Sequence, residues 1–268
     1  MGTIEIFGYI GALLIGVILG LIGGGGSILT VPVLVYLLSI NPVTATAYSL
    51  FVVGVSALVG ALRNIQNGLV DFRTAIVFSI PAFIAVYSAR RFILPIIPEE
   101  IVQIGDYTLT KNVGIMIFFA IIMLIASVSM IRSRNGNNGE GKEVKFNYPL
   151  IIFEGLLVGL VTGIVGAGGG FLIIPALVLL AGLPMKKAVA TSLLIIAVKS
   201  LIGFIGDIET LEIDWNFLLL FTLISAIGIF FGIKLGTYIK GEKLKKGFGW
   251  FVLIMGVFII LKEFSVFS

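Results

Sequence analysis

The stretch GLIGGGGSILTVPVLVYLL, residues 20–38, interrupts what would otherwise be one continuous apolar helix. Positions 23–26 are all glycine, and each glycine in a helix interior is roughly 1 kcal/mol less favourable than alanine. The stretch GIVGAGGGFLIIPALVL, residues 163–179, does the same thing in the second half of the chain. An apolar helix is therefore broken twice, at similar places, by residues that contribute no side-chain packing.

The composition indicates the bilayer as the solvent of these helices. Apolar residues make up 59% of the 268 residues, charged residues only 12%, and the mean hydropathy is +1.18. Soluble domains average about 25% charged residues. A helix needs about 20 apolar residues to cross a hydrocarbon core about 30 Å thick, and such runs follow one another along this chain. We expect an all-α polytopic protein of the cell membrane.

Ten apolar segments make up this prediction. They cover residues 4–22, 27–39, 43–63, 72–92, 111–131, 149–166, 170–181, 186–206, 214–237 and 244–262. Eight are long enough to span a membrane, whereas 27–39 and 170–181 would cover only roughly 20 Å. We therefore expect about eight full spans and two short helices that follow glycine breaks.

The two halves of the chain match each other when one is shifted by 143 positions. Glycines, prolines, a serine and an aspartate coincide, which is harder to attribute to chance than a match of apolar residues. The matched pairs include Gly23/Gly166, Gly25/Gly168, Gly26/Gly169, Pro32/Pro175, Ser49/Ser192 and Asp71/Asp214. We predict two tandem repeats, residues 1–131 and 149–268, joined by a hydrophilic loop at 132–148.

The relative orientation of the repeats depends on how the short segments are counted. If each short segment returns to the side where its repeat began, the repeats are inverted, both termini are outside, and most Lys and Arg residues fall in cytoplasmic loops. If each broken pair forms a single crossing, the repeats are parallel and this bias weakens. We favour the inverted arrangement.

Short, glycine-interrupted segments at matching places in two halves are typical of a transporter's binding site. Backbone that leaves helical geometry inside a bilayer must be buried in protein or line a polar cavity. The helix that follows each break begins with unpaired N–H groups and the positive end of its dipole, which attract anions. The residues that we expect to bind an anion there are Gly23, Gly24, Gly25, Gly26, Ser27, Gly166, Gly168, Gly169 and Gly170. The alternative is that these glycines serve helix packing alone, as Gly16, Gly20, Gly54, Gly159 and Gly163 are expected to do.

The paired motifs GLIGGGGSILTVPVL with NPVTATAYSLFVVGVSALVGALRN, and GIVGAGGGFLIIPAL with LPMKKAVATSLLIIAVKSLIGFIGD, resemble the TauE/SafE family of sulfite exporter-like permeases. The resemblance covers both repeats and most of the chain. It implies a permease for small sulfur oxyanions or organosulfonates such as sulfite, thiosulfate or sulfoacetate. The residues by themselves indicate only an anion.

Three further side chains are candidates for the same site. Lys199 lies within an apolar segment, where a charge is costly and is by default a functional hypothesis. It could hold the anion, or instead reach the outer interface or neutralise Glu154. The hydroxyls of Ser49 and Ser192 could face the glycine turns, or bond to carbonyls of their own helices.

Other polar residues have structural interpretations. Asp71 and Asp214 each precede a long apolar run and are expected to be helix N-caps. We expect Arg90 and Arg91 to be interfacial anchors. The segment ends Arg63, Asn64 and Asp207 are also expected at the interface.

Several function classes are disfavoured. The chain contains no cysteine and no histidine, so thiol chemistry, haem ligation by histidine and most zinc sites are excluded, and we expect no cofactor or metal. It has no phosphate-binding G-x-x-x-x-G-K-[ST] motif, so it does not hydrolyse nucleotide itself, and nothing indicates nucleic acid. A plausible catalytic set is lacking too, so we expect no enzyme. The main hypothesis is a secondary transporter with alternating access, and the alternative is an anion channel built from the same glycine turns.

Overall fold

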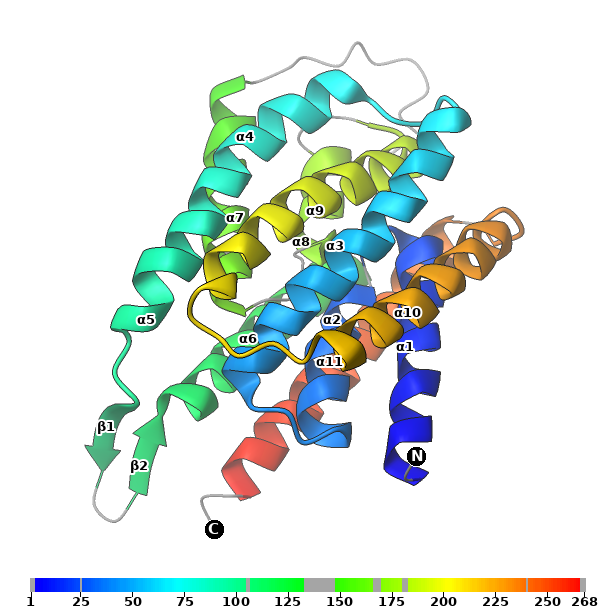
Figure 1. Cartoon of the computed structure of the whole chain (residues 1–268). Helices are drawn as coiled ribbons and strands as arrows, with labels where there is room; N and C mark the ends of the chain where they lie inside the picture. Colours follow the sequence, from blue (N-terminus) through cyan, green and yellow to red (C-terminus); the bar gives the residue numbers. More distant parts are fainter. Residues whose placement is uncertain are drawn as a thin grey trace.

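The computed structural model describes residues 3–24, 26–104, 107–132, 148–165, 170–179, 183–239 and 241–265. Within these ranges nearly all of the chain is helical (Figure 1). The first half contains α1 (Thr3–Ile22), α2 (Gly26–Pro32), the π-helical η1 (Val33–Leu37), α3 (Pro42–Gln66), α4 (Phe72–Ser88), the π-helical η2 (Ala89–Ile93), α5 (Leu94–Ile96), β1 (Glu100–Ile104), β2 (Tyr107–Thr110) and α6 (Lys111–Arg132). The second half contains α7 (Tyr148–Val165), α8 (Gly170–Leu179), α9 (Met185–Ile208), α10 (Trp215–Gly236) and α11 (Gly241–Ser265).

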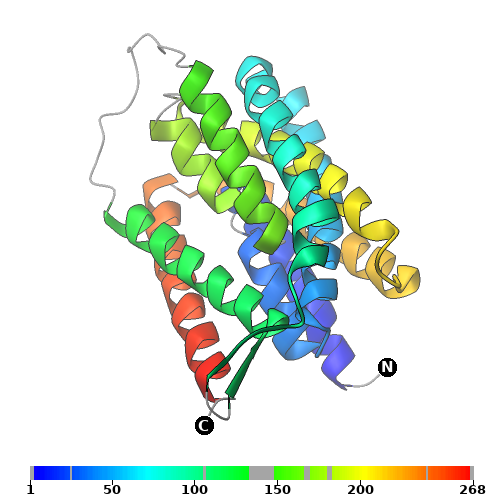
Figure 2. The same ribbon diagram turned by 90° about the vertical axis from the view of Figure 1, so that its left-hand side faces the viewer.

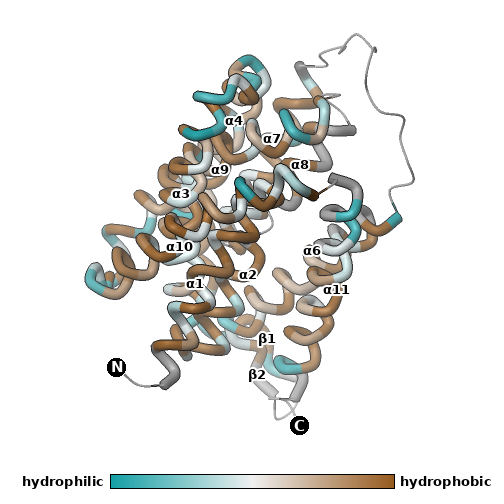
Figure 3. The backbone as a smooth tube through the Cα atoms, turned by 90° about the vertical axis from the view of Figure 1, so that its right-hand side faces the viewer, coloured by the Kyte–Doolittle hydropathy of each residue, from teal (hydrophilic) through white to brown (hydrophobic). Residues whose placement is uncertain are grey.

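These helices are those of a membrane protein. The spans Pro42–Gln66, Phe72–Ile96, Met185–Ile208 and Trp215–Gly236 are each long and apolar enough to cross a bilayer, and α1, α6 and α7 contain shorter apolar stretches. Large apolar side chains such as Ile125, Leu223 and Phe231 are about 60% exposed on the outer faces, where lipid rather than water suits them. Figure 3 shows apolar residues along most of the helix lengths. The predicted fold class, an all-α polytopic membrane protein, is confirmed.

Six long helices pack in the spatial order α7, α4, α9, α3, α10, α1. The central neighbours α3 and α9 occupy matching positions in the two halves (Figure 1). On either side, α1 packs along α10 and α7 packs along α4, so each half contributes helices to both flanks. The short helices α2 and α8 lie in an apolar cluster with α6 and α11, which run side by side in Figure 2. The two halves are thus interleaved rather than separate globules.

Small residues permit the close contacts of the flanking pairs. A Cβ on Gly16 or Gly20 would overlap the backbone of α10, and a Cβ on Gly159 would overlap the carbonyl of Ala82 on α4. Backbone approach through small residues is the usual means of helix association in membranes. The packing role predicted for these glycines is confirmed.

The first short helix turns back along α1. A Cβ on Gly11 would lie 3.0 Å from the side chain of Val33, and one on Gly8 would lie 2.6 Å from that of Leu38. These contacts join the first half of α1 to the beginning of η1 and to the residue that follows it. After the break, the chain therefore returns to the end of the molecule where α1 begins. The last residues of α11 lie at this same end (Figures 1 and 2).

Local structure recurs at the offset of 143 residues. The amide of Ile40 donates to Leu34 O and the amide of Leu183 donates to Leu177 O, both at 2.9 Å. These bonds close the turns that lead out of the two short-helix regions. The β1–β2 hairpin is a difference, because the sequence analysis predicts no strands and the second half has none among its described residues.

Candidate functional site

The first glycine break is a true interruption of the helix. α1 ends at Ile22, Gly23 has a φ of +80°, and α2 begins at Gly26. The amide of Gly23 still makes a helical hydrogen bond to Leu19 O at 2.7 Å. The positive φ of Gly23 then ends the helix at this residue. A positive φ strains residues with a Cβ, which explains the glycine at position 23. Gly25 and the side chain of Ser27 lie outside the described part of the structure.

The second glycine stretch reaches the first break through Gly170. α7 ends at Val165 and α8 begins at Gly170. The predicted site residues Gly166, Gly168 and Gly169 fall in the gap between these helices, which is outside the described residues. Gly24 and Gly170 lie backbone against backbone, so a Cβ on either would overlap the main chain of the other. The starts of α2 and α8 are therefore neighbours in the interior of the helix bundle.

Of the two candidate serines, Ser192 lies beside the first break. Its hydroxyl is 2.8 Å from Val189 O and 3.4 Å from Gly23 O, so the shorter bond stays within α9 while the side chain also touches the glycine turn. Ser49, at the matching position on α3, is fully buried and its Oγ has no hydrogen-bond partner among the described residues. An unpartnered buried hydroxyl is destabilising unless a further group satisfies it.

Lys199 is the buried cation of this region. It is 0% exposed, and its Nζ donates to Thr162 Oγ1 at 2.8 Å. Thr162 lies one helical turn before the end of α7, so the ammonium group is close to the second break. Among the described residues no carboxylate pairs with Lys199. Neither alternative from the sequence is therefore observed: the side chain does not reach the surface, and Glu154 does not neutralise it.

Two equivalent hydrogen bonds fix the starts of α4 and α10. The Asp71 amide donates to Thr191 Oγ1 at 2.9 Å, and the Asp214 amide donates to Tyr48 OH at 2.7 Å. Tyr48 and Thr191 are equivalent positions that precede the candidate serines. Each aspartate also caps its helix, since Oδ1 accepts from the amide three residues later. The N-cap prediction for both aspartates is confirmed, and the caps additionally join the two halves.

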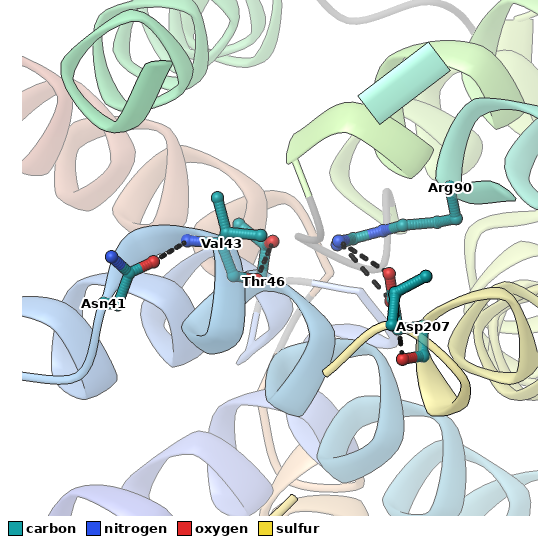
Figure 4. Close-up of polar contacts among 6 residues, drawn as sticks. Asn41, Val43, Thr46, Arg90 and Asp207 are labelled. Atoms are coloured by element: carbon teal, nitrogen blue, oxygen red, sulfur yellow. Dashed lines mark hydrogen bonds and ion pairs between the residues drawn. The ribbon is translucent and has the colours of Figure 1, made fainter. Parts of the chain in front are cut away.

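Three other polar residues are buried inside the protein, which the sequence did not indicate. Arg90 and Asp207, expected at the membrane interface, are buried and form an ion pair in which Arg90 Nη1 lies 3.5 Å from Asp207 Oδ1 and Oδ2 (Figure 4). Asn64 is also buried and donates to Gly60 O. The fourth apolar segment is expected to end at residue 92, but the span continues to Ile96, so Arg90 lies further from its end than the sequence indicates. The apolar residues after Arg91 were the available signal.

A cavity of about 600 Å³ lies elsewhere, between the final turns of α3 and α10. Polar and charged residues, among them Arg63, Gln66 and Lys234, line it together with apolar side chains. It opens at the opposite end of the molecule from the chain ends and does not include the glycine contact. We therefore base the candidate site on the paired breaks and Lys199 rather than on this cavity.

Comparisons with known proteins agree on one family. The family model described as "Sulfite exporter TauE/SafE" matches residues 9–259. A probable membrane transporter protein of Xylella fastidiosa is 26% identical over 257 residues, which cover 94% of this chain and 93% of that protein. The probable membrane transporter protein YunE of Bacillus subtilis is 28% identical over 272 residues, covering 93% and 92%. No solved structure matches the chain.

Proposed function

Because this chain belongs to the TauE/SafE family of membrane transporters, we propose that it is a secondary transporter that carries small sulfite- or sulfonate-type anions across the cell membrane. The family model is named for a sulfite exporter, and this name suggests the class of solute. The relatives named above are described only as probable membrane transporters. The anionic character of the solute is supported independently by the residues at the breaks.

The observation that carries this proposal is the contact between Gly24 and Gly170. It brings the starts of α2 and α8 together inside the bundle. The first amides of a helix have no intrahelical acceptor, and they carry the positive end of the helix dipole. Two such ends side by side favour a negative charge more than either does alone. The anion binds beside this contact, at the backbone of residues 23–26 and 166–170.

Lys199 supplies the full positive charge of this site. A lysine inside a membrane helix is costly unless it is paired. Thr162 is its one hydrogen-bond partner among the described residues, and because the ammonium group has three donors, two remain for an anion. An anion at the second break would compensate the charge. Ser49 would provide a neutral donor, because its hydroxyl has no partner among the described residues, and Ser192 would provide another by giving up its bond to Val189 O.

Alternating access follows from the interleaved packing. If the repeats 1–131 and 149–268 are inverted, the glycine contact lies close to the pseudo-twofold axis between them. Movement of the α1–α10 flank against the α4–α7 flank would then open the site first to one side and afterwards to the other. The contact of α3 with α9 is the interface at which this movement would occur.

Counterflow in proteoliposomes tests the function. Liposomes loaded with unlabelled sulfite, thiosulfate or methanesulfonate should accumulate the labelled form of the transported anion above equilibrium, with saturable kinetics. Gly24→Ala should abolish this exchange, because the added Cβ would overlap Gly170. Gly247→Ala is the matched control, since a Cβ there would meet no atom within 4 Å. Single-channel currents without counterflow would instead establish the anion channel and overturn the carrier.

A further inference from the structure

Arg90 is the largest fully buried side chain of the described residues, and the candidate site does not use it. It lies on the π-helical η2, which continues α4 toward the end of the molecule where the chain begins. π-Helical segments are rare and are frequently found at functional sites. Asp207, in the last turn of α9, is its ion-pair partner, and the two side chains are 0% and 3% exposed.

The ion pair uses only one nitrogen of the guanidinium group. Both carboxylate oxygens of Asp207 are 3.5 Å from Nη1, which is long for a charge-assisted hydrogen bond. Nε and Nη2 have no hydrogen-bond partner among the described residues. These two nitrogens form the side-on edge of guanidinium, which binds carboxylates and other oxyanions through two parallel hydrogen bonds. The edge suited to an oxyanion is thus the one that Asp207 leaves unpaired.

The ion pair of Arg90 and Asp207 lies beside the first turns of α3. A Cβ on Gly54 would contact Leu201, and the rings of Phe51 and Phe204 are 4.9 Å apart, so α3 and α9 run in opposite directions. The end of α9 therefore reaches the beginning of α3. In Figure 4 the guanidinium group faces Asp207 and extends toward the side where Asn41 and Thr46 of α3 lie.

The matching place in the other half has no such pair. At the offset of 143 residues, Asp207 corresponds to Asn64 and Arg90 corresponds to Ile233. Asn64 bonds to its own helix, and Ile233 lines the cavity of about 600 Å³. The cavity thus separates the ends of α3 and α10 at one end of the molecule. At the other end, the buried ion pair of Arg90 and Asp207 joins the equivalent segments, α9 and η2. Repeat symmetry and packing do not require an arginine at this place.

We propose that Arg90 is a second oxyanion-binding residue, at the end of the molecule opposite the cavity, where the transported anion takes the side-on edge and competes with Asp207 for the charge of the guanidinium group. This inference rests on the proposed transport of anions. Because the Nη1 contact with Asp207 is long, this competition weakens the link between η2 and α9, so the arriving anion favours opening of the junction. The ligand class is a small anion with at least two oxygens on one centre, such as a sulfite, a sulfonate or a carboxylate.

Two substitutions with opposite expected effects on KM test the proposal in the full-length protein in proteoliposomes. Arg90→Lys keeps the positive charge opposite Asp207 but lacks the side-on edge, so KM for sulfite should rise about tenfold or more. Asp207→Asn removes the competing carboxylate, so KM should fall. Arg91→Gln is the matched control, because Arg91 pairs with the exposed Glu209 and is itself 36% exposed; its KM should stay near that of the wild type.

Thermal unfolding compares anion binding by the Asp207→Asn and wild-type proteins without a transport assay. Sulfite should raise the melting temperature of purified Asp207→Asn protein more than that of the wild type, because the anion replaces the missing carboxylate. A purely structural ion pair predicts instead that both substitutions change KM in the same direction or leave it unchanged, and either result overturns the proposal. If the wild type itself exchanges neither sulfite, thiosulfate nor methanesulfonate, the proposed function fails and this inference fails with it.

Discussion

Replacing Lys199 with methionine should weaken anion binding while leaving the protein at least as stable. Methionine has a similar length and is apolar, so it fills the buried space between α9 and α7 without the charge. Lys199 is 0% exposed and bonds only to Thr162 among the described residues. The substitution weakens binding because the anion-loaded protein loses a charged contact. It does not lower stability because the unloaded protein no longer has to bury an unpaired charge.

The magnitudes follow from this environment. A hydrogen bond to a charged group contributes about 1.5–3 kcal/mol, so its loss from the anion complex should raise KM roughly 10- to 150-fold. In the unloaded protein, removal of a lysine from a membrane helix recovers up to about 3 kcal/mol. The lost bond to Thr162 offsets about 1.5–3 kcal/mol of this, so the free energy of unfolding should be unchanged or slightly higher.

Uptake kinetics and thermal unfolding of the same preparation provide the assay. Ser56→Ala is the matched control, because Ser56 is the equivalent position on α3 and makes a neutral buried bond to Ser225 Oγ at 3.0 Å. It should alter stability without raising KM. A Lys199→Met protein with the wild-type KM would refute the reasoning, as would one whose loss of transport is matched by a lower melting temperature.

Three further predictions concern the surrounding helices. Gly170→Ala should abolish transport, because its Cβ would overlap Gly24, and uptake assays on the folded variant measure this. Asp214→Ala should lower the free energy of unfolding by about 1 kcal/mol through loss of the cap on α10, with KM unchanged, as chemical denaturation and uptake would show. Tyr48→Phe should be destabilising by about 1–3 kcal/mol, because the Asp214 amide loses its acceptor; unchanged unfolding would argue against that bond.

Much of the fold could be predicted because the bilayer restricts the possibilities. Apolar segment lengths and the absence of lipid-exposed irregular backbone determine where spans can lie. The break at Gly23 could be located for the same reason, since consecutive glycines disrupt an apolar helix. The N-caps at Asp71 and Asp214 follow from local chemistry at a helix start.

The less predictable features depend on contacts between distant segments. Whether Arg90 is buried depends on α9, which lies more than 100 residues later and supplies Asp207. The contact of Gly24 with Gly170 and the bond from Asp71 to Thr191 join the two halves. Residue spacing within either half contains no information about these pairings. The β1–β2 hairpin differs from these features, because the sequence contains its signal: Gly105 and Asp106 separate two short runs with Ile, Val, Tyr and Thr, and a Gly-Asp pair is typical of a two-residue hairpin turn.

The most direct test of the central claim is the position of the bound anion. Selenite is a heavier analogue of sulfite, and its selenium atom can be located by anomalous scattering from crystals of the full-length protein grown with it. We predict a selenium peak beside Gly24 and Gly170, at the starts of α2 and α8 and within reach of Lys199 Nζ. Selenium found only in the cavity lined by Arg63 and Lys234, with the paired glycine breaks unoccupied, would contradict the account.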